Sequence, residues 1–303
     1  MNRQKSFEND LPTLYLVPTP IGNLNEMSER ALEVLNYVDV IACEDTRTSG
    51  VLLKHFNISK RLISYQNYNE NASSKGIVQL LKEGTKVALI SDAGYPLVSD
   101  PGQRVVMDVI GAGFNVVPVS GSNAVLNALV ASGLIVQPFI FVGFLPPNTN
   151  DCVKKLKEYK PYPMTLVFYE APHRLEKMLK SALEVLGDRK CCVAREMTKI
   201  HEEFIRGRIS EVLEIADTLK GEMVVVIAGN SDDYEKDIDM SHLLELVEQA
   251  EERGLSKSEA IKEVALNEGV SKNVLYDYVH NKEKRSWVMY LIRHLMHRYI
   301  YLY

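Results

Sequence analysis

Residues 86–124 have the sequence KVALISDAGYPLVSDPGQRVVMDVIGAGFNVVPVSGSNA. Two short apolar runs, at 86–91 and 115–119, enclose a loop rich in glycine, proline and aspartate and then a stretch with helical spacing. A strand that is apolar throughout is typical of a sheet covered on both faces, and a helix between two such strands predicts parallel pairing. We therefore expect an open α/β domain around this segment.

The same alternation extends toward the N-terminus. The expected strands of the first half are 13–17, 38–43, 61–65, 86–91 and 115–119, and the expected helices are 28–37, 48–56, 69–83, 101–111 and 122–132. Ser28 is a candidate N-cap, and Pro101 is expected at the first helical position of its helix. This half is predicted to be an α/β domain over residues 11–134.

The second half has a different order of elements. Its expected strands are 139–145, 164–170, 190–196, 203–207 and 223–229, and its expected helices are 153–159, 174–186 and 209–219. Two strands, 190–196 and 203–207, follow each other across a short loop, which predicts antiparallel pairing. We expect a second α/β domain over residues 135–231, reached by a short connection within 122–137.

The C-terminal quarter is predicted to be helical. After an acidic linker at 231–239, the segments 241–253, 256–267 and 271–280 each begin with serine, a preferred N-cap. A turn at Glu268-Gly269 gives the module 241–281 a helix–turn–helix-like pattern suited to RNA contact, with a plain helical cap as the alternative. The tail 282–303 carries five basic residues and one acidic residue. It is either a basic amphipathic helix or a terminal helix without chemical function.

Composition narrows the classes of function. The chain has 303 residues, with 35 Lys and Arg against 40 Asp and Glu, so binding to nucleic acid through bulk positive charge is excluded. Its four cysteines form no C-x-x-C pair, which argues against a disulfide scaffold or a structural zinc site. No apolar run approaches the ~18 residues of a membrane span. We expect a soluble cytoplasmic protein without a bound metal.

Unusual loops follow all five strands of the first half. In a parallel sheet these loops share one edge, where ligands bind. They are 18–24, 44–47, 66–69, 91–102 and 120–122. The first loop has one glycine where a dinucleotide site needs three, and G-x-x-x-x-G-K-[ST], G-x-S-x-G and H-E-x-x-H are absent. The sequence therefore predicts a ligand cleft without a nicotinamide cofactor.

Several long motifs carry a family resemblance. They are LVPTPIGNLNEMSERAL (16–32), EDTR (44–47), SDAGYPLVSDPG (91–102), VPVSGSNA (117–124), FVGFLPP (141–147), FYEAPHRL (168–175), REMTKIHEEFIRG (195–207) and GEMVVVIAG (221–229). In this order they resemble the tetrapyrrole-methylase-like methyltransferases, and within them the ribosomal RNA small subunit methyltransferase I branch. Corrin and diphthine members have a glycine-rich first loop, whereas residues 18–22 here are PTPIG, which favours the RNA branch.

The resemblance implies a fold and a reaction. The fold is two α/β domains with a cleft between them, and the methyl donor S-adenosylmethionine binds in that cleft. The acceptor is the 2′-hydroxyl of a cytidine in the decoding centre of 16S rRNA in the small ribosomal subunit, and the enzyme is a homodimer. The residues placed against the donor are Pro18, Ser91, Asp92, Ala93, Gly94, Tyr95, Pro96, Ser120, Gly121, Ser122, Phe168 and Tyr169.

A ribose hydroxyl needs a group that orients it and takes its proton. The candidates are Glu44, Asp45, Glu170, Glu196 and Lys199. A lysine base would need its pKa lowered by burial or by a cation such as Arg195. Alternatively, Glu44 and Asp45 only hold Arg47, and Glu196 and Lys199 belong to a surface ion-pair set.

Local basic groups are expected to contact the RNA. The candidates are Arg47, Lys54, Arg174, Arg195, Lys199, Arg206 and Arg208 near the cleft, and Lys257, Lys262 and Lys272 in the C-terminal module. Two alternatives stay open at this point. One is a methyltransferase of the same fold that acts on a corrin or porphyrin, and the other is a non-catalytic RNA-binding assembly factor.

Overall fold

The structure is a computed structural model. It describes residues 3–66 except 7 and 10, 70–230, 240–268, 272, 275, 276 and 278–280. The chain forms two compact units, Met1–Asn230 and Ser231–Tyr303. The predicted linker at 231–239, the tail at 282–303 and positions 67–69 of the third loop lie outside the described residues. No described helix is long and apolar enough to span a membrane.

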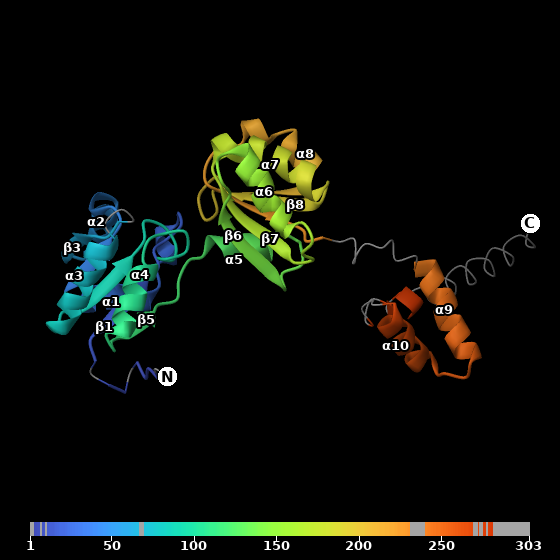
Figure 1. Cartoon of the computed structure of the whole chain (residues 1–303), viewed down its shortest axis with the longest axis horizontal. Coiled ribbons are helices and arrows are strands. Elements are labelled where there is room, and N and C mark those ends of the chain that lie inside the picture. Colours follow the sequence, from blue (N-terminus) through green and yellow to red (C-terminus); the bar gives the residue numbers. More distant parts are fainter. Residues whose placement is uncertain are drawn as a thin grey trace, which may run out of the picture. The chain divides into compact units, whose positions relative to one another are not determined.

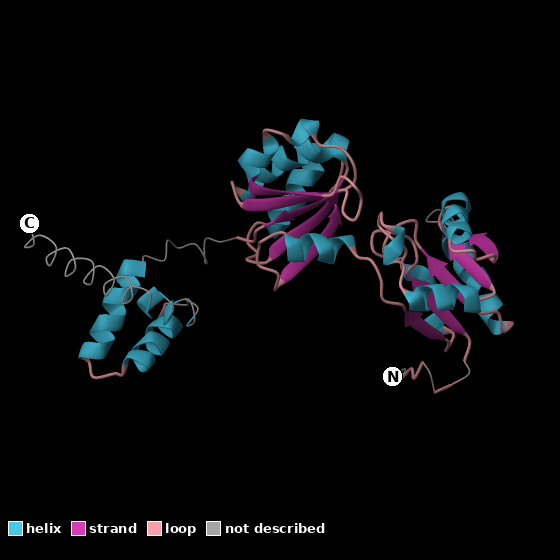
Figure 2. Cartoon of the chain, turned by 180° about the vertical axis from the view of Figure 1, so that it is seen from behind, coloured by secondary structure: helices cyan, strands magenta, loops and turns pink. Residues whose placement is uncertain are grey.

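The first unit contains two five-stranded sheets, which Figure 2 shows in magenta. The first is made of β1 (Thr13–Val17), β2 (Val40–Cys43), β3 (Arg61–Ser64), β4 (Val87–Ile90) and β5 (Asn115–Pro118). Its order is β3-β2-β4-β1-β5 and every pair is parallel. The predicted parallel sheet is thus confirmed, with β2 and β4 buried throughout and the edge strand β3 partly exposed.

Helices cover both faces of this sheet. They are α1 (Glu29–Tyr37), α2 (Thr46–His55), α3 (Glu70–Lys82) and α4 (Gln103–Gly111). Val34 and Leu53 bring α1 and α2 into one core cluster, whereas Ile77 and Val105 bring α3 and α4 into another. Because side chains alternate along a strand, the same strands supply both clusters, and their polar loops are left at the sheet edge.

The predicted position of Pro101 at the start of a helix is wrong. Helix α4 begins at Gln103, and its N-cap is Gly102 at φ +143°. Ser99 is also left-handed, at φ +71°. The chain therefore makes a turn through residues 99–102 before the helix starts, and this turn projects Asp100 from the sheet edge.

The second sheet is mostly antiparallel. It consists of β6 (Phe139–Phe144), β7 (Thr165–Glu170), β8 (Lys190–Arg195), β9 (Glu203–Arg208) and β10 (Met223–Ile227), in the order β6-β7-β10-β8-β9. Only β6 and β7 pair in parallel, and β8 pairs antiparallel with β9 as predicted.

One face of the second sheet packs against α6 (Thr149–Tyr159), α7 (Pro172–Leu186), α8 (Ile209–Leu213) and the 3-10 turn η3 (Ala216–Thr218). The single helix predicted at 209–219 is therefore wrong. The chain breaks between α8 and η3, and Val212 before the break and Ala216 after it are both buried.

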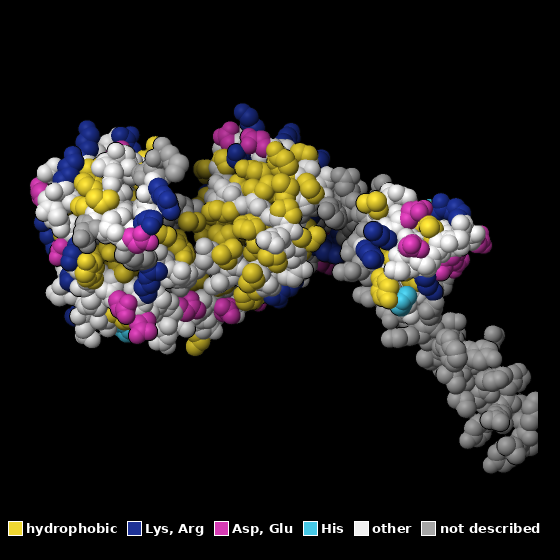
Figure 3. Space-filling view, turned by 90° about the horizontal axis from the view of Figure 1, so that it is seen from below, with side chains coloured by type: hydrophobic (Ala, Val, Ile, Leu, Met, Phe, Trp, Pro, Cys, Tyr) yellow, Lys and Arg dark blue, Asp and Glu magenta, His cyan; other side chains and the backbone are white. Residues whose placement is uncertain are grey.

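Helix α5 (Ala124–Ala131) covers the other face of the second sheet, beside β6 and β7 in Figure 1. The Arg206 side chain on β9 donates to the Ala131 carbonyl at 3.1 and 2.6 Å and so caps this helix. Leu126 and Val130 stay 47% and 65% exposed, and Figure 3 shows hydrophobic side chains gathering over the part of the molecule that holds this sheet. The boundary between the two α/β domains at residue 134 stays a prediction. The packing of α5 on the second sheet favours a boundary before this helix.

The second unit contains α9 (Met240–Glu252) and α10 (Lys257–Asn267). Val247 and Ile261 pack in one buried cluster, which Leu275 and Val279 join. Ser256 caps α10 in a reciprocal capping box with Glu259, as its sequence position predicts. Ser241 lies inside α9, not at its N-cap, because the helix already includes Met240. The described positions of 271–280 are helical, and the predicted turn at Gly269 lies outside the described residues.

Candidate functional site

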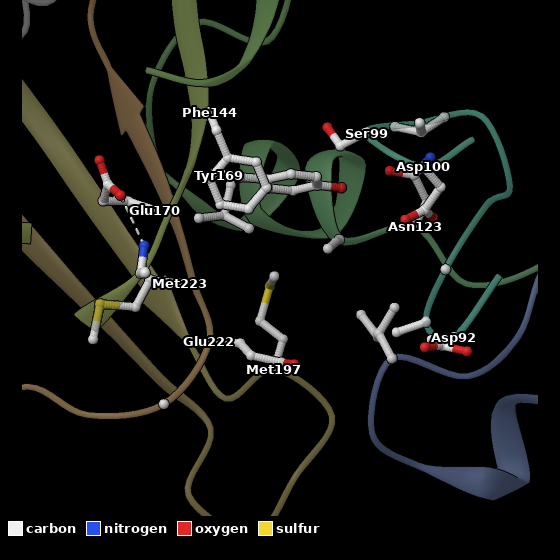
Figure 4. A pocket seen from close by; sticks show the side chains of 18 of the residues that line it. Asp92, Ser99, Asp100, Asn123, Phe144, Tyr169, Glu170, Met197, Glu222 and Met223 are labelled. Atoms are coloured by element: carbon white, nitrogen blue, oxygen red, sulfur yellow. Dashed lines mark hydrogen bonds between the residues drawn. The ribbon is translucent and has the colours of Figure 1, made fainter. Parts of the chain in front are cut away.

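A cavity of about 690 Å³ is lined by both sheets of the first unit. The loops of the first sheet contribute Ile21, Glu44, Asp92, Ala93, Gly94, Tyr95, Val98, Ser99, Asp100, Asn123 and Ala124. The second sheet and its loops contribute Phe144, Tyr169, Glu170, Ala171, Pro172, Glu196, Met197, Lys199, Gly221, Glu222, Met223 and Val224. Figure 4 shows the two sets facing each other across the cavity. The loops after β1, β2 and β4 therefore meet at one site, as the sequence predicts, and the start of α5 rather than the predicted loop 120–122 joins them.

Backbone contacts join the loops after β1 and β4. Thr19 and Gly94 exchange two backbone hydrogen bonds, of 2.9 and 3.0 Å. The Ser91 hydroxyl donates to the Gly94 carbonyl at 2.6 Å, and the Thr19 hydroxyl donates to the Ser91 carbonyl at 3.0 Å. Ser91 and Thr19 are buried, so they shape the cavity wall from behind.

The loop after β5 is attached to the same framework. The Gly121 N–H donates to the Tyr95 hydroxyl at 3.1 Å. A Cβ atom at Gly121 would lie 2.5 Å from Cγ of Pro18, so only glycine allows this approach. The Ser28 hydroxyl donates to the Ser120 carbonyl, and the Ser122 hydroxyl donates to Glu26.

The predicted donor contacts therefore fall into two groups. Asp92, Ala93, Gly94, Tyr95 and Tyr169 line the cavity, whereas Pro18, Ser91, Pro96, Ser120, Gly121, Ser122 and Phe168 do not. Phe168 has no exposed surface and packs in the core beneath α7. Its side chain cannot offer a contact, because the alternation along β7 turns Phe168 into the core and Tyr169 toward the cavity.

Three carboxylates face the cavity from the first sheet: Glu44, Asp92 and Asp100. Burial raises the pKa of Asp100 to about 6, with the charges of Glu44 and Asp92 adding to the rise. Burial also raises the pKa of Asp92, which accepts a hydrogen bond from the Asp45 backbone N–H. None of the three has an ion pair with a described residue, and no described group of His, Cys, Asp and Glu is arranged to hold a metal ion. A ligand with positive charge is therefore favoured here.

Left-handed backbone marks the two loops that border the cavity. Of the five non-glycine residues with positive φ in the described chain, Leu97 and Ser99 lie in the loop after β4. Glu196 and Thr198 lie in the turn after β8, at φ +48° and +67°. Such conformations cost about 1–3 kcal/mol each and gather at functional sites.

The turn after β8 holds Lys199 between two carboxylates. Its Nζ lies 3.1 Å from Oε1 of Glu196 and 2.8 Å from Oε2 of Glu222. Glu196 also accepts the Glu222 backbone N–H at 2.9 Å, and this bond first, then Lys199, lowers the pKa of Glu196. Burial acts to lower the pKa of Lys199, but the two carboxylates outweigh it and raise the pKa. The lowered pKa that a lysine base needs is not found.

Asp45 turns away from the cavity. Its carboxylate caps α2 by accepting the Arg47 backbone N–H at 2.8 Å and pairs with the Arg47 guanidinium at 2.8 Å. The hydrogen bonds from Arg47 lower the pKa of Asp45 to about 2. For Asp45, the structure therefore agrees with the alternative interpretation of the sequence, in which this carboxylate only holds Arg47.

Several of the predicted RNA contacts, Arg174 and Arg195 among them, are occupied within the protein. The Arg174 guanidinium donates to the Leu145 carbonyl at 2.6 Å and lies 3.3 Å from Glu170. Arg195 pairs with Glu203 and donates to the Lys220 carbonyl at 3.2 Å. Their expected role as free cations is not supported, because carbonyl partners distant in sequence hold them. Arg47, with 89% of its side chain exposed, and the exposed Lys262 and Lys272 remain candidates, whereas Lys257 is partly buried.

Comparisons with known proteins agree with this architecture. The profile of the family Tetrapyrrole (Corrin/Porphyrin) Methylases matches residues 13–213. Solved structures of a uroporphyrin-III-C-methyltransferase from Thermus thermophilus and of a diphthine synthase superpose with TM-scores of 0.51 and 0.56, at 21% and 13% identity. Each superposition covers 71% of this chain. It covers 94% of the uroporphyrin-III-C-methyltransferase chain and 90% of the diphthine synthase chain. At this identity they show the fold alone.

Relatives with much higher identity carry one name, "Ribosomal RNA small subunit methyltransferase I". The protein of that name from Bacillus subtilis is 44% identical and the one from Halalkalibacterium halodurans is 42% identical. Each alignment covers 93% of this chain and 100% of the relative. The chain therefore belongs to the ribosomal RNA small subunit methyltransferase I family of S-adenosylmethionine-dependent tetrapyrrole-methylase-fold enzymes.

Proposed function

We propose that the protein transfers a methyl group from S-adenosylmethionine to the 2′-hydroxyl of a cytidine in the decoding centre of 16S rRNA. The observation that carries the proposal is a cavity built by both sheets, in a chain whose relatives of full length are named small-subunit rRNA methyltransferases. On the side of the first sheet this cavity is lined by three carboxylates that have no ion pair with a described residue. The names of the relatives support rRNA of the small subunit as the substrate. The choice of a cytidine 2′-hydroxyl as the acceptor rests on the resemblance of the sequence motifs to the family.

The residues at the cavity fit the methyl donor. A volume of about 690 Å³ is in the ~300–1,000 Å³ range of small-molecule sites. The donor carries a sulfonium and an ammonium, and the carboxylates of Glu44, Asp92 and Asp100 supply the complementary charge. Ala93, Gly94, Tyr95 and Tyr169 would hold its uncharged parts, with backbone groups of the loop after β4 in reach.

When bound, the donor supplies an electrophilic methyl carbon. The protein's own contribution is to hold the acceptor oxygen in line with that carbon and to keep water away. Positioning of this kind contributes up to about 7–11 kcal/mol to a barrier. The framework of Thr19, Gly94 and Gly121 is made of short backbone contacts, so the loops are rigid before any ligand arrives.

Glu44→Gln and Lys199→Ala are each expected to lower turnover far more than donor affinity. Glu44 faces the cavity from the end of β2, and the Lys199 cation holds Glu196 and Glu222 in place. Single-turnover methyl transfer at saturating donor measures the effect on turnover, and titration with the donor by calorimetry measures the effect on donor affinity. Rates like those of the wild type in both variants would remove both residues from the catalytic machinery.

Assembled small subunits are expected to be better acceptors than free 16S rRNA. The net charge of −5 gives weak attraction to free RNA, so recognition by shape of a folded particle is favoured. Tritium transfer from labelled donor to each substrate measures this difference, and equal rates would contradict it. The RNA-contact role of the C-terminal module and the homodimer remain predictions.

A further inference from the structure

We infer that Ile200 and His201 pack against an unstacked base of the rRNA when a nucleotide enters the cavity. This inference rests on the proposed function, because it requires an RNA acceptor. The two residues are the tip of the turn from Glu196 to Glu202, which joins β8 to β9. Ile200 is 94% exposed, more than any other large hydrophobic side chain of the described residues, and His201 beside it is also exposed.

The turn borders the cavity on the side of the second sheet. Glu196, Met197 and Lys199 line the cavity, and Figure 4 shows the Met197 side chain directed into it. Ile200 and His201 follow Lys199 directly in the chain but are not part of the lining. The turn therefore presents three residues to the cavity and holds its tip in solvent beside it.

Hydrogen bonds within the turn hold its backbone. Glu196 and Thr198 are left-handed, at φ +48° and +67°. The Lys199 N–H donates to the Glu196 carbonyl, and the Glu202 N–H donates to the Lys199 carbonyl, both at 3.0 Å. The Thr198 N–H donates to Oε2 of Glu202 at 2.7 Å. Because the backbone is held in this strained conformation, the tip cannot fold back to bury its apolar side chain.

Contacts from two other segments fix the turn from outside. The Asn23 N–H, in the loop after β1, donates to the Thr198 hydroxyl oxygen at 2.9 Å. A Cβ atom at Gly22 would lie 2.6 Å from Cγ of Lys199, so the same loop packs closely on the turn. Nζ of Lys199 lies 2.8 Å from Oε2 of Glu222, directly before β10. The tip is therefore preorganised, and a ligand that contacts it does not have to order its backbone.

The chemistry of the tip fits the face of a base better than a phosphate group. An aliphatic side chain and an imidazole ring offer apolar and flat surfaces, on which an unstacked base can pack. The charged residues next to the tip in sequence are Lys199, Glu202 and Glu203. Lys199 already lies between two carboxylates, and Glu203 pairs with Arg195. Carboxylates on the C-terminal side of the tip disfavour phosphate oxygens there.

The position of the tip fits an RNA acceptor. A cavity of about 690 Å³ has the size of a small-molecule site and cannot admit a folded RNA, so the nucleotides that flank the target stay outside it. A nucleotide that enters an active site leaves the stack of its neighbours, and apolar side chains commonly fill the space between unstacked bases. A second copy of this chain is disfavoured as the occupant, because a stable protein interface buries ~800 Å² per partner, far more than two side chains offer.

The test compares Ile200→Ala, His201→Ala and the double variant with a matched control, Met107→Ala. Met107 is 62% exposed on α4 and does not line the cavity. Single-turnover methyl transfer over a range of small-subunit concentrations gives the half-saturating concentration. We expect it to rise about 10-fold in each single variant and further in the double variant, because base stacking is lost. The control should match the wild type. A double variant with the half-saturating concentration of the wild type would overturn the inference.

Further readouts distinguish a contact from a structural role. Donor affinity by calorimetry and the melting temperature should not change in the tip variants, since both side chains are exposed outside the cavity lining. His201→Phe should use small subunits like the wild type, because a phenyl ring stacks on a base as an imidazole does. A His201→Phe variant as weak as His201→Ala, or a tip variant with a lower melting temperature, would contradict the stacking contact.

Photo-crosslinking identifies the occupant directly. With p-benzoylphenylalanine in place of Ile200, irradiation of the full chain with small subunits and S-adenosylmethionine should crosslink it to 16S rRNA near the methylated nucleotide. Crosslinks only to a ribosomal protein or to a second copy of the chain would contradict the inference.

The outcomes also separate this inference from the proposed function. If the wild type methylates the rRNA and the tip variants behave like it, the function stands and the tip is not a contact. If the wild type labels no rRNA of the small subunits, the proposed function fails, whereas the crosslink still shows whether the tip touches RNA.

Discussion

Arg174→Ala is expected to lower the free energy of unfolding by about 2–3 kcal/mol, the largest loss of stability that we predict for a single charged residue. The Glu170 side chain is 1% exposed and lies 3.3 Å from Arg174, whose own side chain is 24% exposed. Removing the cation leaves a buried carboxylate without a counter-charge and frees the Leu145 carbonyl. Because Arg174 is partly exposed, the expected loss of stability is smaller than the ~3–5 kcal/mol typical of breaking a fully buried ion pair.

Urea denaturation of the variant measures this loss. Lys180→Ala is the matched control on the same helix, because its ion pair with Glu176 is exposed and contributes less than about 1 kcal/mol. Burial already raises the pKa of Glu170, and the variant should raise it further, so the loss should be smaller at pH 5 than at pH 8. Unchanged stability with weakened RNA binding would support the original prediction of an RNA contact.

Ala93→Trp is expected to weaken donor binding by about 100-fold or more, equivalent to about 2.7 kcal/mol. Ala93 lies in the loop after β4 and lines the cavity with an exposed side chain. An indole there occupies the space in which the donor is proposed to bind, and the exposed position allows the protein to fold around it.

Isothermal calorimetry with S-adenosylmethionine measures the effect. Ala112→Trp is the control, since Ala112 is exposed at the C-cap of α4 and does not line the cavity. Equal affinities for both variants would mean that the donor binds elsewhere.

Much of this fold could be predicted because it depends on local patterns. Apolar runs such as 87–90 and 223–227 can form only buried strands, and the loops that follow them in a parallel sheet must share an edge. The capping of α10 by Ser256 is equally local. Helix α5 was harder to assign, because its sequence follows β5 and nothing local indicates that it packs on the second sheet.

The charged groups of the site depend on partners far away in sequence. Lys199 pairs with Glu222 across 23 positions, and Arg174 donates to a carbonyl 29 positions away. The pattern therefore could not show that Lys199 stays protonated or that Arg174 is unavailable for RNA. Asp100 was overlooked because DPG also fits a helix start, although a carboxylate beside Glu44 and Asp92 at one sheet edge was a usable signal.

The most direct measurement is mass spectrometry of nucleosides from small subunits that lack the modification, incubated with the purified protein and S-adenosylmethionine. We predict one new 2′-O-methylated cytidine per particle, located in the decoding centre of the 16S rRNA and absent when Ala93→Trp replaces the wild type. A methyl group on a base, on another region of the rRNA, or on no nucleotide at all would contradict the proposed reaction.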